Sequence, residues 1–207
     1  YTATRSEGIP IWIDGTEIPW MTYPAICYLK QIDFSKSNIF EYGCGKSTVY
    51  WSRRAKRVIS VEHDPEWFRS ISSLGLTNTE VRLASGPDYA NSVYSDGPHD
   101  VIVIDGRWRY DCSRAVLPNL AHGGMVIVDN SERYPSINNY LRASGLIQID
   151  MIGYGPVNKY IWCTSLFLHR AADFPSIGPA QPSGLPGLVE SIENQPHWAE
   201  ANQPGVR

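Results

Sequence analysis

Short apolar runs rich in β-branched residues alternate with amphipathic stretches through the middle of the chain. The runs predict strands at residues 38–42, 57–62, 80–83, 100–105, 124–129, 146–152 and 161–169. The stretches between them predict helices at residues 47–55, 65–74, 111–120 and 135–144. Such alternation is typical of an α/β fold, so we expect a mostly parallel seven-stranded sheet with helices on both faces.

The two ends of the chain differ from this alternating core. Residues 1–36 combine an aromatic, proline-rich stretch with a helical stretch at about 23–32, which we expect to cover the sheet. Residues 171–207 contain six prolines and predict a tail with one short helical piece near 185–194. Residues 37–170 form the predicted core, and the length of the chain fits one domain.

The charge balance argues against a polyanionic partner. Lys and Arg number 18 against 21 Asp and Glu, and the net charge of -3 provides no basic field for nucleic acid or an anionic membrane. No apolar run approaches the roughly 20 residues that span a bilayer. We therefore expect a small-molecule partner, with neither nucleic acid nor membrane binding; the oligomeric state is left unassigned.

The cysteines indicate a reducing compartment. The four residues Cys27, Cys44, Cys112 and Cys163 are far apart and lack the paired spacing of a zinc or redox site. We expect reduced thiols and a cytoplasmic location.

A glycine loop follows the first predicted strand. Gly43 and Gly45 allow close backbone approach to a ligand, and the helix that follows offers unpaired N–H groups. A phosphate-binding P-loop would need glycine where Phe40 stands, which excludes that motif. A dinucleotide fingerprint would place its third glycine at Thr48, so that interpretation is weakened but stays open.

Glu62 ends the second predicted strand, 19 residues after Gly43. This is close to the roughly 20 residues at which an acid binds the ribose hydroxyls of a nucleotide-like cofactor. The carboxylate also argues against a 2′-phosphorylated cofactor, because like charges repel. Glu62 is therefore predicted to bind ribose, with a solvated strand-end carboxylate as the alternative.

Together these motifs resemble the class I S-adenosylmethionine-dependent methyltransferases over about residues 37–170. The resemblance rests on Glu41-x-Gly43-x-Gly45-x-Ser47-Thr48, on Val61-Glu62-His63-Asp64, on residues 100–106 with Asp105, and on residues 123–130 with Asp129-Asn130. It implies a Rossmann-like fold, S-adenosylmethionine as cofactor and methyl transfer as the reaction.

The resemblance also implies roles for single residues. The methionine part of the cofactor would be bordered by Glu41, Gly43, Gly45 and Ser47. Its ribose would contact Glu62. Its adenine would lie near His63 and near residues 84–86, which include Ser85. Asp105 would contact the cofactor or position the acceptor, and it is the predicted catalytic residue.

Three oxygen-bearing side chains follow two neighbouring strands. Asp105 follows one strand, and Asp129 and Asn130 follow the next, so they meet at the edge where open α/β sheets bind ligands. Such oxygens suit Mg²⁺, and the arrangement is similar to that of catechol-type O-methyltransferases. We predict a magnesium site here, with a metal-free pocket in which Asp105 only positions a ligand as the alternative.

One departure from the catechol type concerns the base. The lysine expected three residues after Asp105 is replaced by Trp108, so deprotonation would fall to the metal or to a histidine. Nearby polar residues would instead bind an anionic acceptor, namely Arg107, Arg109, Tyr110 and Arg133. The aromatic residues that would wall the acceptor pocket, or else pack in the core, are Trp12, Trp20, Tyr23 and Trp108.

The sequence therefore predicts a methyltransferase that methylates a hydroxyl of a small molecule with magnesium assistance. Three alternatives stay open: an aminopropyltransferase-like enzyme, a dinucleotide-dependent enzyme, and a non-catalytic cofactor-binding module.

Overall fold

The computed structural model describes residues 8–178, and its centre is a seven-stranded sheet in the order β3-β2-β1-β4-β5-β7-β6. The strands are β1 (Asn38–Tyr42), β2 (Arg57–Glu62), β3 (Thr79–Leu83), β4 (His99–Ile104), β5 (Leu120–Asp129), β6 (Ile147–Gly153) and β7 (Trp162–Leu168). Neighbours from β3 to β5 pair in parallel, and β7 pairs antiparallel with both β5 and β6. The predicted mostly parallel Rossmann-like sheet is confirmed.

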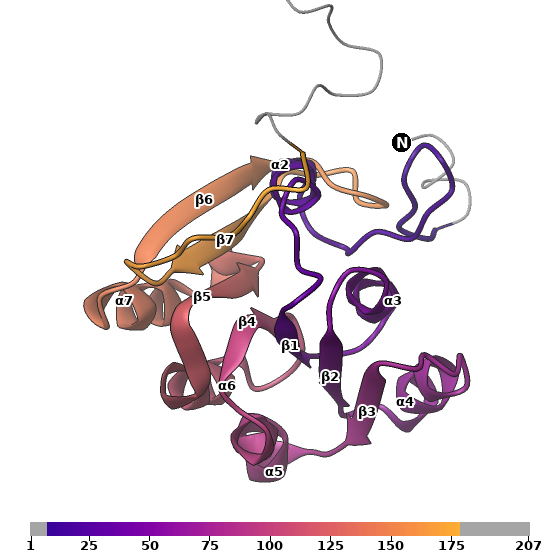
Figure 1. Ribbon diagram of the computed structural model, residues 1–207, viewed down its shortest axis with the longest axis horizontal. Helices are drawn as coiled ribbons and strands as arrows, with labels where there is room; N and C mark the ends of the chain where they lie inside the picture. Colours follow the sequence, from indigo (N-terminus) through magenta and orange to yellow (C-terminus); the bar gives the residue numbers. More distant parts are fainter. Residues whose placement is uncertain (1–7, 179–207) are drawn as a thin grey trace, which may run out of the picture.

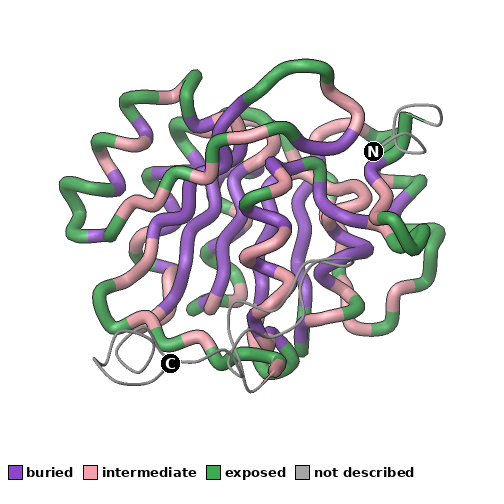
Figure 2. The backbone as a smooth tube through the Cα atoms, turned by 90° about the horizontal axis from the view of Figure 1, so that it is seen from above, coloured by how far each residue is buried: buried purple, intermediate pink, exposed green. Residues whose placement is uncertain are grey.

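Helices cover both faces of this sheet (Figure 1). They are α2 (Tyr23–Leu29), α3 (Lys46–Ser52), α4 (Pro65–Ser72), α5 (Gly86–Asn91), α6 (Arg109–Val116) and α7 (Pro135–Ala143), with short 3-10 turns η1 (Ser92–Ser95), η2 (Leu117–Asn119) and η3 (Ser131–Arg133). One apolar core lies under α5, α6 and α7, and a second lies under α2 and α3. Figure 2 shows the buried backbone concentrated in the strands between these layers.

The predicted elements match most of the observed ones. Residues 38–42 and 57–62 are strands with the predicted bounds. The predicted helix 111–120 is shorter than expected, because Pro118 interrupts it and Leu120 already pairs with β4. The helix α5 was missed, since Gly86 and Pro87 at its start are read as loop signals.

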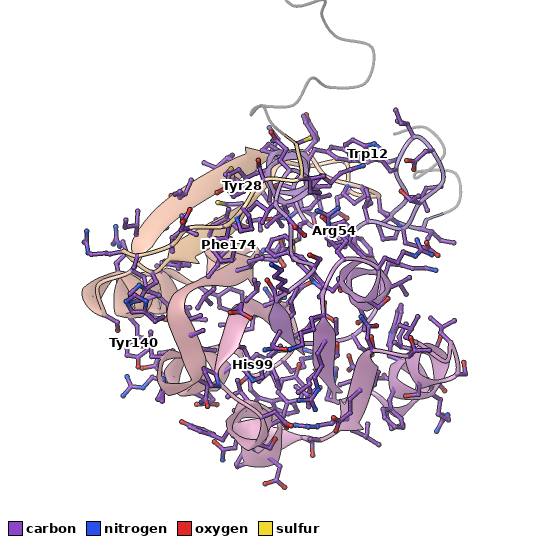
Figure 3. The ribbon with its side chains drawn as sticks, viewed as in Figure 1. Trp12, Tyr28, Arg54, His99, Tyr140 and Phe174 are labelled. Atoms are coloured by element: carbon purple, nitrogen blue, oxygen red, sulfur yellow. The ribbon has the colours of Figure 1, made fainter. Side chains whose placement is uncertain are left out.

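The N-terminal segment is fastened to the helices of one face. Glu17 forms ion pairs with Arg53 at 2.6 Å and with Lys46 at 3.6 Å. Arg54, which Figure 3 labels, donates from Nη2 to the carbonyl oxygens of Leu29, Lys30 and Ile32. These contacts bind carbonyl groups at and just beyond the end of α2 and tie that end to the residue stretch after α3.

The far end of the chain returns to the same face. Ile32 forms an isolated antiparallel bridge with Ser176. The rest of the predicted tail, with its helical piece near 185–194, lies outside the described residues.

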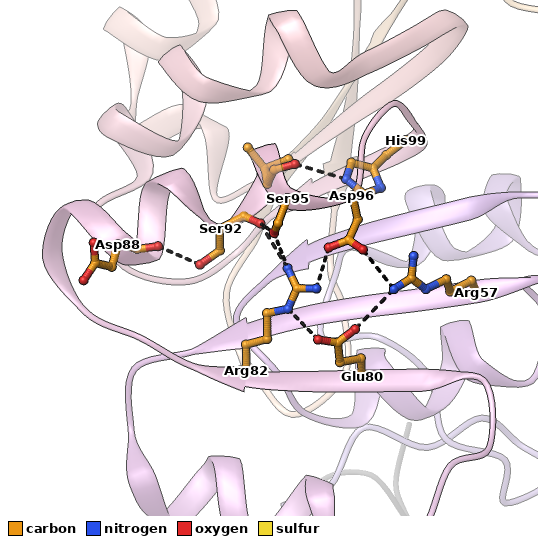
Figure 4. Close-up of polar contacts among 9 residues, drawn as sticks. Arg57, Glu80, Arg82, Asp88, Ser92, Ser95, Asp96 and His99 are labelled. Atoms are coloured by element: carbon orange, nitrogen blue, oxygen red, sulfur yellow. Dashed lines mark hydrogen bonds and ion pairs between the residues drawn. The ribbon is translucent and has the colours of Figure 1, made fainter.

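An ion-pair network holds the outer strand β3 at the edge of the sheet away from β6. Arg57 Nη2 contacts Glu80 Oε2 at 3.2 Å and Asp96 Oδ1 at 3.1 Å, while Arg82 contacts the same two carboxylates (Figure 4). The network involves the start of β2 and the turn after η1, so it braces the sheet without occupying the carboxyl ends of the strands.

In residues 8–178 no helix is long and apolar enough to cross a membrane. All four cysteines are free thiols, as the sequence predicts.

Candidate active site

The glycine loop turns sharply between β1 and α3. Gly43 has φ of 96°, a left-handed conformation that favours glycine, and its N–H donates to the carbonyl of Val61 at 2.8 Å. A Cβ at Gly43 would lie 3.3 Å from the Cα of Gly106. The loop therefore runs directly against the backbone that leaves β4.

A hollow of about 640 Å³ opens beside this loop. We call it the glycine-loop hollow, and its walls are formed by Glu41, Gly43, Cys44, Ser47, Glu62, His63, Trp67, Asp105, Gly106, Arg107, Trp108, Arg109, Tyr110, Asp111 and Tyr134. Of the eight residues predicted to bind cofactor, Gly45 and Ser85 are absent from its walls and the other six line it. Gly45 instead caps α3, and Ser85 precedes α5.

Glu41 brings a buried carboxylate to the wall of this hollow. Its Oε2 accepts hydrogen bonds from Thr48 Oγ1 at 2.6 Å and from Ser60 Oγ at 2.8 Å. Its Oε1 is buried without a hydrogen-bond partner. Burial raises the pKa of Glu41 to about 7. An oxygen left unpaired in this way is suited to a donor supplied by a ligand.

Glu62 organises the backbone around the loop. Its Oε2 accepts from the N–H of Cys44 at 2.9 Å, and its Oε1 accepts from the N–H groups of His63 and Asp64 at 2.7 and 2.8 Å. The ring of His63 also approaches Oε1, with Nδ1 at 2.6 Å. Only 6% of the Glu62 side chain is exposed, so the carboxylate is held rigidly at the hollow.

Aromatic rings stand along one side of the hollow. The ring of Trp108 lies edge-to-face with that of His63, 5.8 Å between centroids, and 5.3 Å from that of Tyr89. Trp108 has φ of 46° at the start of α6. Trp67, which is 56% exposed, lines the hollow as well, although the sequence gives no signal for it beyond its amphipathic helix.

A second hollow of about 410 Å³ lies at the ends of β4 and β5. We call it the Asp129 hollow, and it is lined by Trp20, Asp105, Asp129, Asn130, Arg133, Asn158 and Tyr160. It contains the three predicted magnesium ligands, and Asp105 lines both hollows. Asn158 and Tyr160, from the turn between β6 and β7, were not predicted.

The Asp129 carboxylate is buried at the base of the second hollow. Its Oδ1 accepts from Trp162 Nε1 at 3.1 Å and from Thr164 Oγ1, both on β7. Burial, followed by repulsion from Asp105, raises the pKa of Asp129. Burial also raises the pKa of Asp105, although the guanidinium of Arg109 opposes that rise.

Arg109 joins the ends of the two strands. It donates from Nη2 to Asp105 Oδ1 at 2.8 Å and from Nε to the carbonyl of Gly106 at 3.0 Å. Its Nη1 donates to the backbone carbonyl of Asp129. The guanidinium also lies 5.1 Å from the ring centroid of Tyr134, which places it between an aromatic face and the carboxylate.

The predicted aromatic and basic residues separate into groups. Trp12 and Tyr23 pack edge-to-face on each other and against the core under α2, away from both hollows. Trp20 lines the Asp129 hollow, as does Arg133, which pairs with Glu132 at 3.3 Å. Arg107 and Tyr110 line the glycine-loop hollow instead.

One stretch of the chain is similar to a known protein family. Residues 40–131 match the model of a family described as a methyltransferase domain. No curated protein sequence matches the chain.

Solved structures share the fold at low sequence identity. A precorrin-6y C5,15-methyltransferase from Geobacter metallireducens has 14% identity and a TM-score of 0.58, covering 77% of this chain and 96% of that one. The fibrillarin pre-rRNA processing protein of Methanococcus jannaschii has 15% identity and a TM-score of 0.56, with coverages of 72% and 75%. A putative caffeoyl-CoA O-methyltransferase from Staphylococcus aureus has 13% identity and a TM-score of 0.53, with coverages of 70% and 80%.

The matched segment begins inside β1 and ends just beyond β5. It therefore contains the glycine loop, Glu62 and both strand ends that carry Asp105 and Asp129. This segment matches a methyltransferase domain, and the fold around it is shared with solved methyltransferase structures.

Proposed function

We propose that this methyltransferase methylates a hydroxyl oxygen of a small molecule held in the Asp129 hollow. The observation that carries the proposal is that Asp105 lines both hollows, so a cofactor in one and an acceptor in the other would meet at its carboxylate. When bound, S-adenosylmethionine supplies a sulfonium methyl group for in-line displacement by the acceptor oxygen. The match to a methyltransferase domain favours this reaction over the dinucleotide-dependent and aminopropyltransferase-like alternatives.

The residues of the glycine-loop hollow fit the cofactor. The unpaired Oε1 of Glu41 would accept from the cofactor ammonium group, and the rigid carboxylate of Glu62 would accept from ribose hydroxyls. Gly43 lies so close to Gly106 that a Cβ at Gly43 would narrow the space between the glycine loop and the end of β4. His63 and Trp108 offer an aromatic surface for adenine.

The acceptor side favours a small polar molecule. The volume of about 410 Å³ lies in the range of small-ligand sites, and polar groups dominate the wall. As the predicted catalytic residue, Asp105 would orient the acceptor hydroxyl towards the cofactor and accept its proton as the O–C bond forms and the C–S bond breaks. Arg133 would contact an anionic substituent if the acceptor carries one.

The predicted magnesium ligands fit a divalent ion poorly. Asp105 Oδ1 is already paired with Arg109, and Asp129 Oδ1 already accepts two hydrogen bonds. We therefore assign no step of the proposed reaction to magnesium.

A labelled-methyl assay tests the proposed acceptor. The full chain would be incubated with S-adenosylmethionine carrying a tritiated methyl group and with small phenols, catechols and sugar alcohols, or with total RNA. We expect label on one of the hydroxylated small molecules, and we expect Asp105→Asn to lower that transfer by about 100-fold. Asp88→Asn, on the surface of α5, serves as the control and should transfer normally.

RNA is included because one of the proteins of similar fold is described as a pre-rRNA processing protein. Label found on RNA alone would contradict the small-molecule proposal while leaving methyl transfer intact.

The affinity for S-adenosylhomocysteine should depend on the ionisation of Glu41. Since its pKa is raised to about 7, the carboxyl is largely neutral at lower pH and attracts an ammonium group weakly. We expect the affinity to rise with pH, by up to about tenfold per unit below pH 7, and to level off above it. Calorimetry from about pH 5.5 to 7.5 measures this. Glu41→Gln should bind S-adenosylhomocysteine more weakly and with an affinity that no longer depends on pH. If the affinity of that variant kept the same pH dependence, the titrating group would be another residue and not Glu41.

A further inference from the structure

The side chain of Arg109 is committed entirely to the junction of β4 and β5. Only 10% of it is exposed, and its donors reach the Asp105 carboxylate and the backbone carbonyls of Asp105, Gly106 and Asp129. Guanidinium keeps its proton under all ordinary conditions, so this is a permanent positive charge. Its rigid fork holds two strand ends at a fixed separation.

This charge lies beside the position where a divalent ion would have to bind, because it contacts Asp105, one of the predicted ligands. An ion bridging the carboxylates of Asp105 and Asp129 would share Asp105 with the guanidinium, and two cations at such short range repel. The two carboxylates also repel each other, and Arg109 donates both to Asp105 Oδ1 at 2.8 Å and to the backbone carbonyl of Asp129. The positive charge that offsets the repulsion between Asp105 and Asp129 is therefore already provided by Arg109.

We propose that Arg109 is the built-in cation at the junction of β4 and β5, beside the Asp129 hollow, where it takes the place of a divalent ion between Asp105 and Asp129. The consequence that methyl transfer needs no divalent ion rests on the proposed function. The assignment of Arg109 as a positioning residue rests only on its contacts.

Mn²⁺ titration tests this without cofactor or acceptor, because Mn²⁺ accepts the same oxygen ligands as Mg²⁺ and is detected by water-proton relaxation. We expect the wild-type protein to show no binding at this hollow and no change in Tm with Mg²⁺. Arg109→Ala should have a lower Tm and should gain Mn²⁺ binding. With the ion about tenfold above its Kd, the Tm of that variant should rise by about 3 to 5 °C.

Arg114→Ala provides a matched control. Arg114 also lies on α6, with its guanidinium 4.7 Å from the ring centroid of Tyr140, but it contacts neither Asp105 nor Asp129. We expect this variant to gain no Mn²⁺ binding. A folded Arg109→Ala protein that also gains none would show that Arg109 is merely structural and would overturn the proposal.

A second part of the Mn²⁺ experiment uses no substitution at Arg109. Mn²⁺ binding by the wild-type protein that disappears in Asp129→Asn would equally overturn the proposal, even if Arg109→Ala fails to fold. Calorimetry of S-adenosylhomocysteine with and without chelator separates this question from the proposed function. We expect equal affinity in both conditions, whereas no binding in either would contradict the cofactor assignment alone.

Discussion

Gly106→Ala is expected to abolish most cofactor binding and to destabilise the fold. A Cβ at this position would overlap the hydroxyl of Tyr89 and would lie 3.0 Å from the backbone nitrogen of Gly43. Neither neighbour has room to move, since Tyr89 is fully buried and Gly43 is held in the sharp turn. Overpacking of this kind costs about 1 to 3 kcal/mol. Thermal unfolding should show a Tm lower by about 3 to 10 °C.

Calorimetry should show an affinity for S-adenosylhomocysteine at least about tenfold weaker, because the glycine loop must shift into the hollow. The double variant Gly106→Ala with Tyr89→Phe lacks the Tyr89 hydroxyl and should therefore recover part of the Tm and part of the affinity for S-adenosylhomocysteine. The backbone contacts at 3.0 Å limit this recovery.

Gly45→Ala is the matched control for Gly106→Ala. Its Cβ would meet nothing within 4 Å, and its φ of 170° is open to any residue. We expect a cost of at most about 1 kcal/mol at this helix cap and nearly unchanged affinity. If Gly106→Ala behaved like Gly45→Ala, close packing between the loop and β4 would not define the hollow.

The strands could be predicted because their burial pattern is simple. β1 and β2 lie inside the sheet with almost every residue buried, so each appears as a mainly apolar run between loop signals, interrupted only by Glu41 in β1 and by Ser60 in β2 before the terminal Glu62. The residues at which helices begin and end were harder to predict. Serine often caps a helix, and Ser131 and Ser136 lie on either side of the start of α7, yet α7 begins after Tyr134 without a side-chain cap. The competing contacts of Ser131 with Ser165 and Cys163 appear only in the folded sheet.

The positions of Asp105 and Asp129 could be predicted from the sheet topology, whereas the ion pair of Asp105 with Arg109 could not. The carboxyl ends of neighbouring parallel strands must converge, which places Asp105 beside Asp129 from the order of strands alone. The direction of the Arg109 side chain depends on the left-handed turn at Trp108, which the sequence does not signal. The magnesium prediction rests on the oxygens at these strand ends and stays a prediction, and the ion pair between Asp105 and Arg109 could not be inferred from the sequence.

Residues far apart in the sequence explain what else was missed. Asn158 and Tyr160 reach the Asp129 hollow because β6 and β7 form an antiparallel pair beside β5. Tyr134 reaches the glycine-loop hollow across α6. None of the three lies in a motif, so only the folded arrangement identifies them.

Glu62→Ala is expected to weaken S-adenosylhomocysteine binding by about 10- to 150-fold, equivalent to roughly 1.5 to 3 kcal/mol for charge-assisted hydrogen bonds. The structure gives this change two separate causes. The variant would remove a carboxylate proposed to bind ribose hydroxyls. It would also leave the N–H groups of Cys44, His63 and Asp64 without their acceptor and so loosen the glycine loop.

A cycle between protein and ligand separates these two causes, using S-adenosylhomocysteine and its 2′,3′-dideoxy analogue in calorimetry. If Glu62 binds the ribose, the wild-type protein should prefer the natural ligand by at least about tenfold, and Glu62→Ala should bind both ligands about equally. The exposed Glu66 on the neighbouring α4 provides a control, since Glu66→Ala should preserve the wild-type preference. A Glu62→Ala protein that weakens both ligands by the same factor would limit the role of Glu62 to shaping the loop. The ribose would then be bound by the remaining polar groups of the hollow.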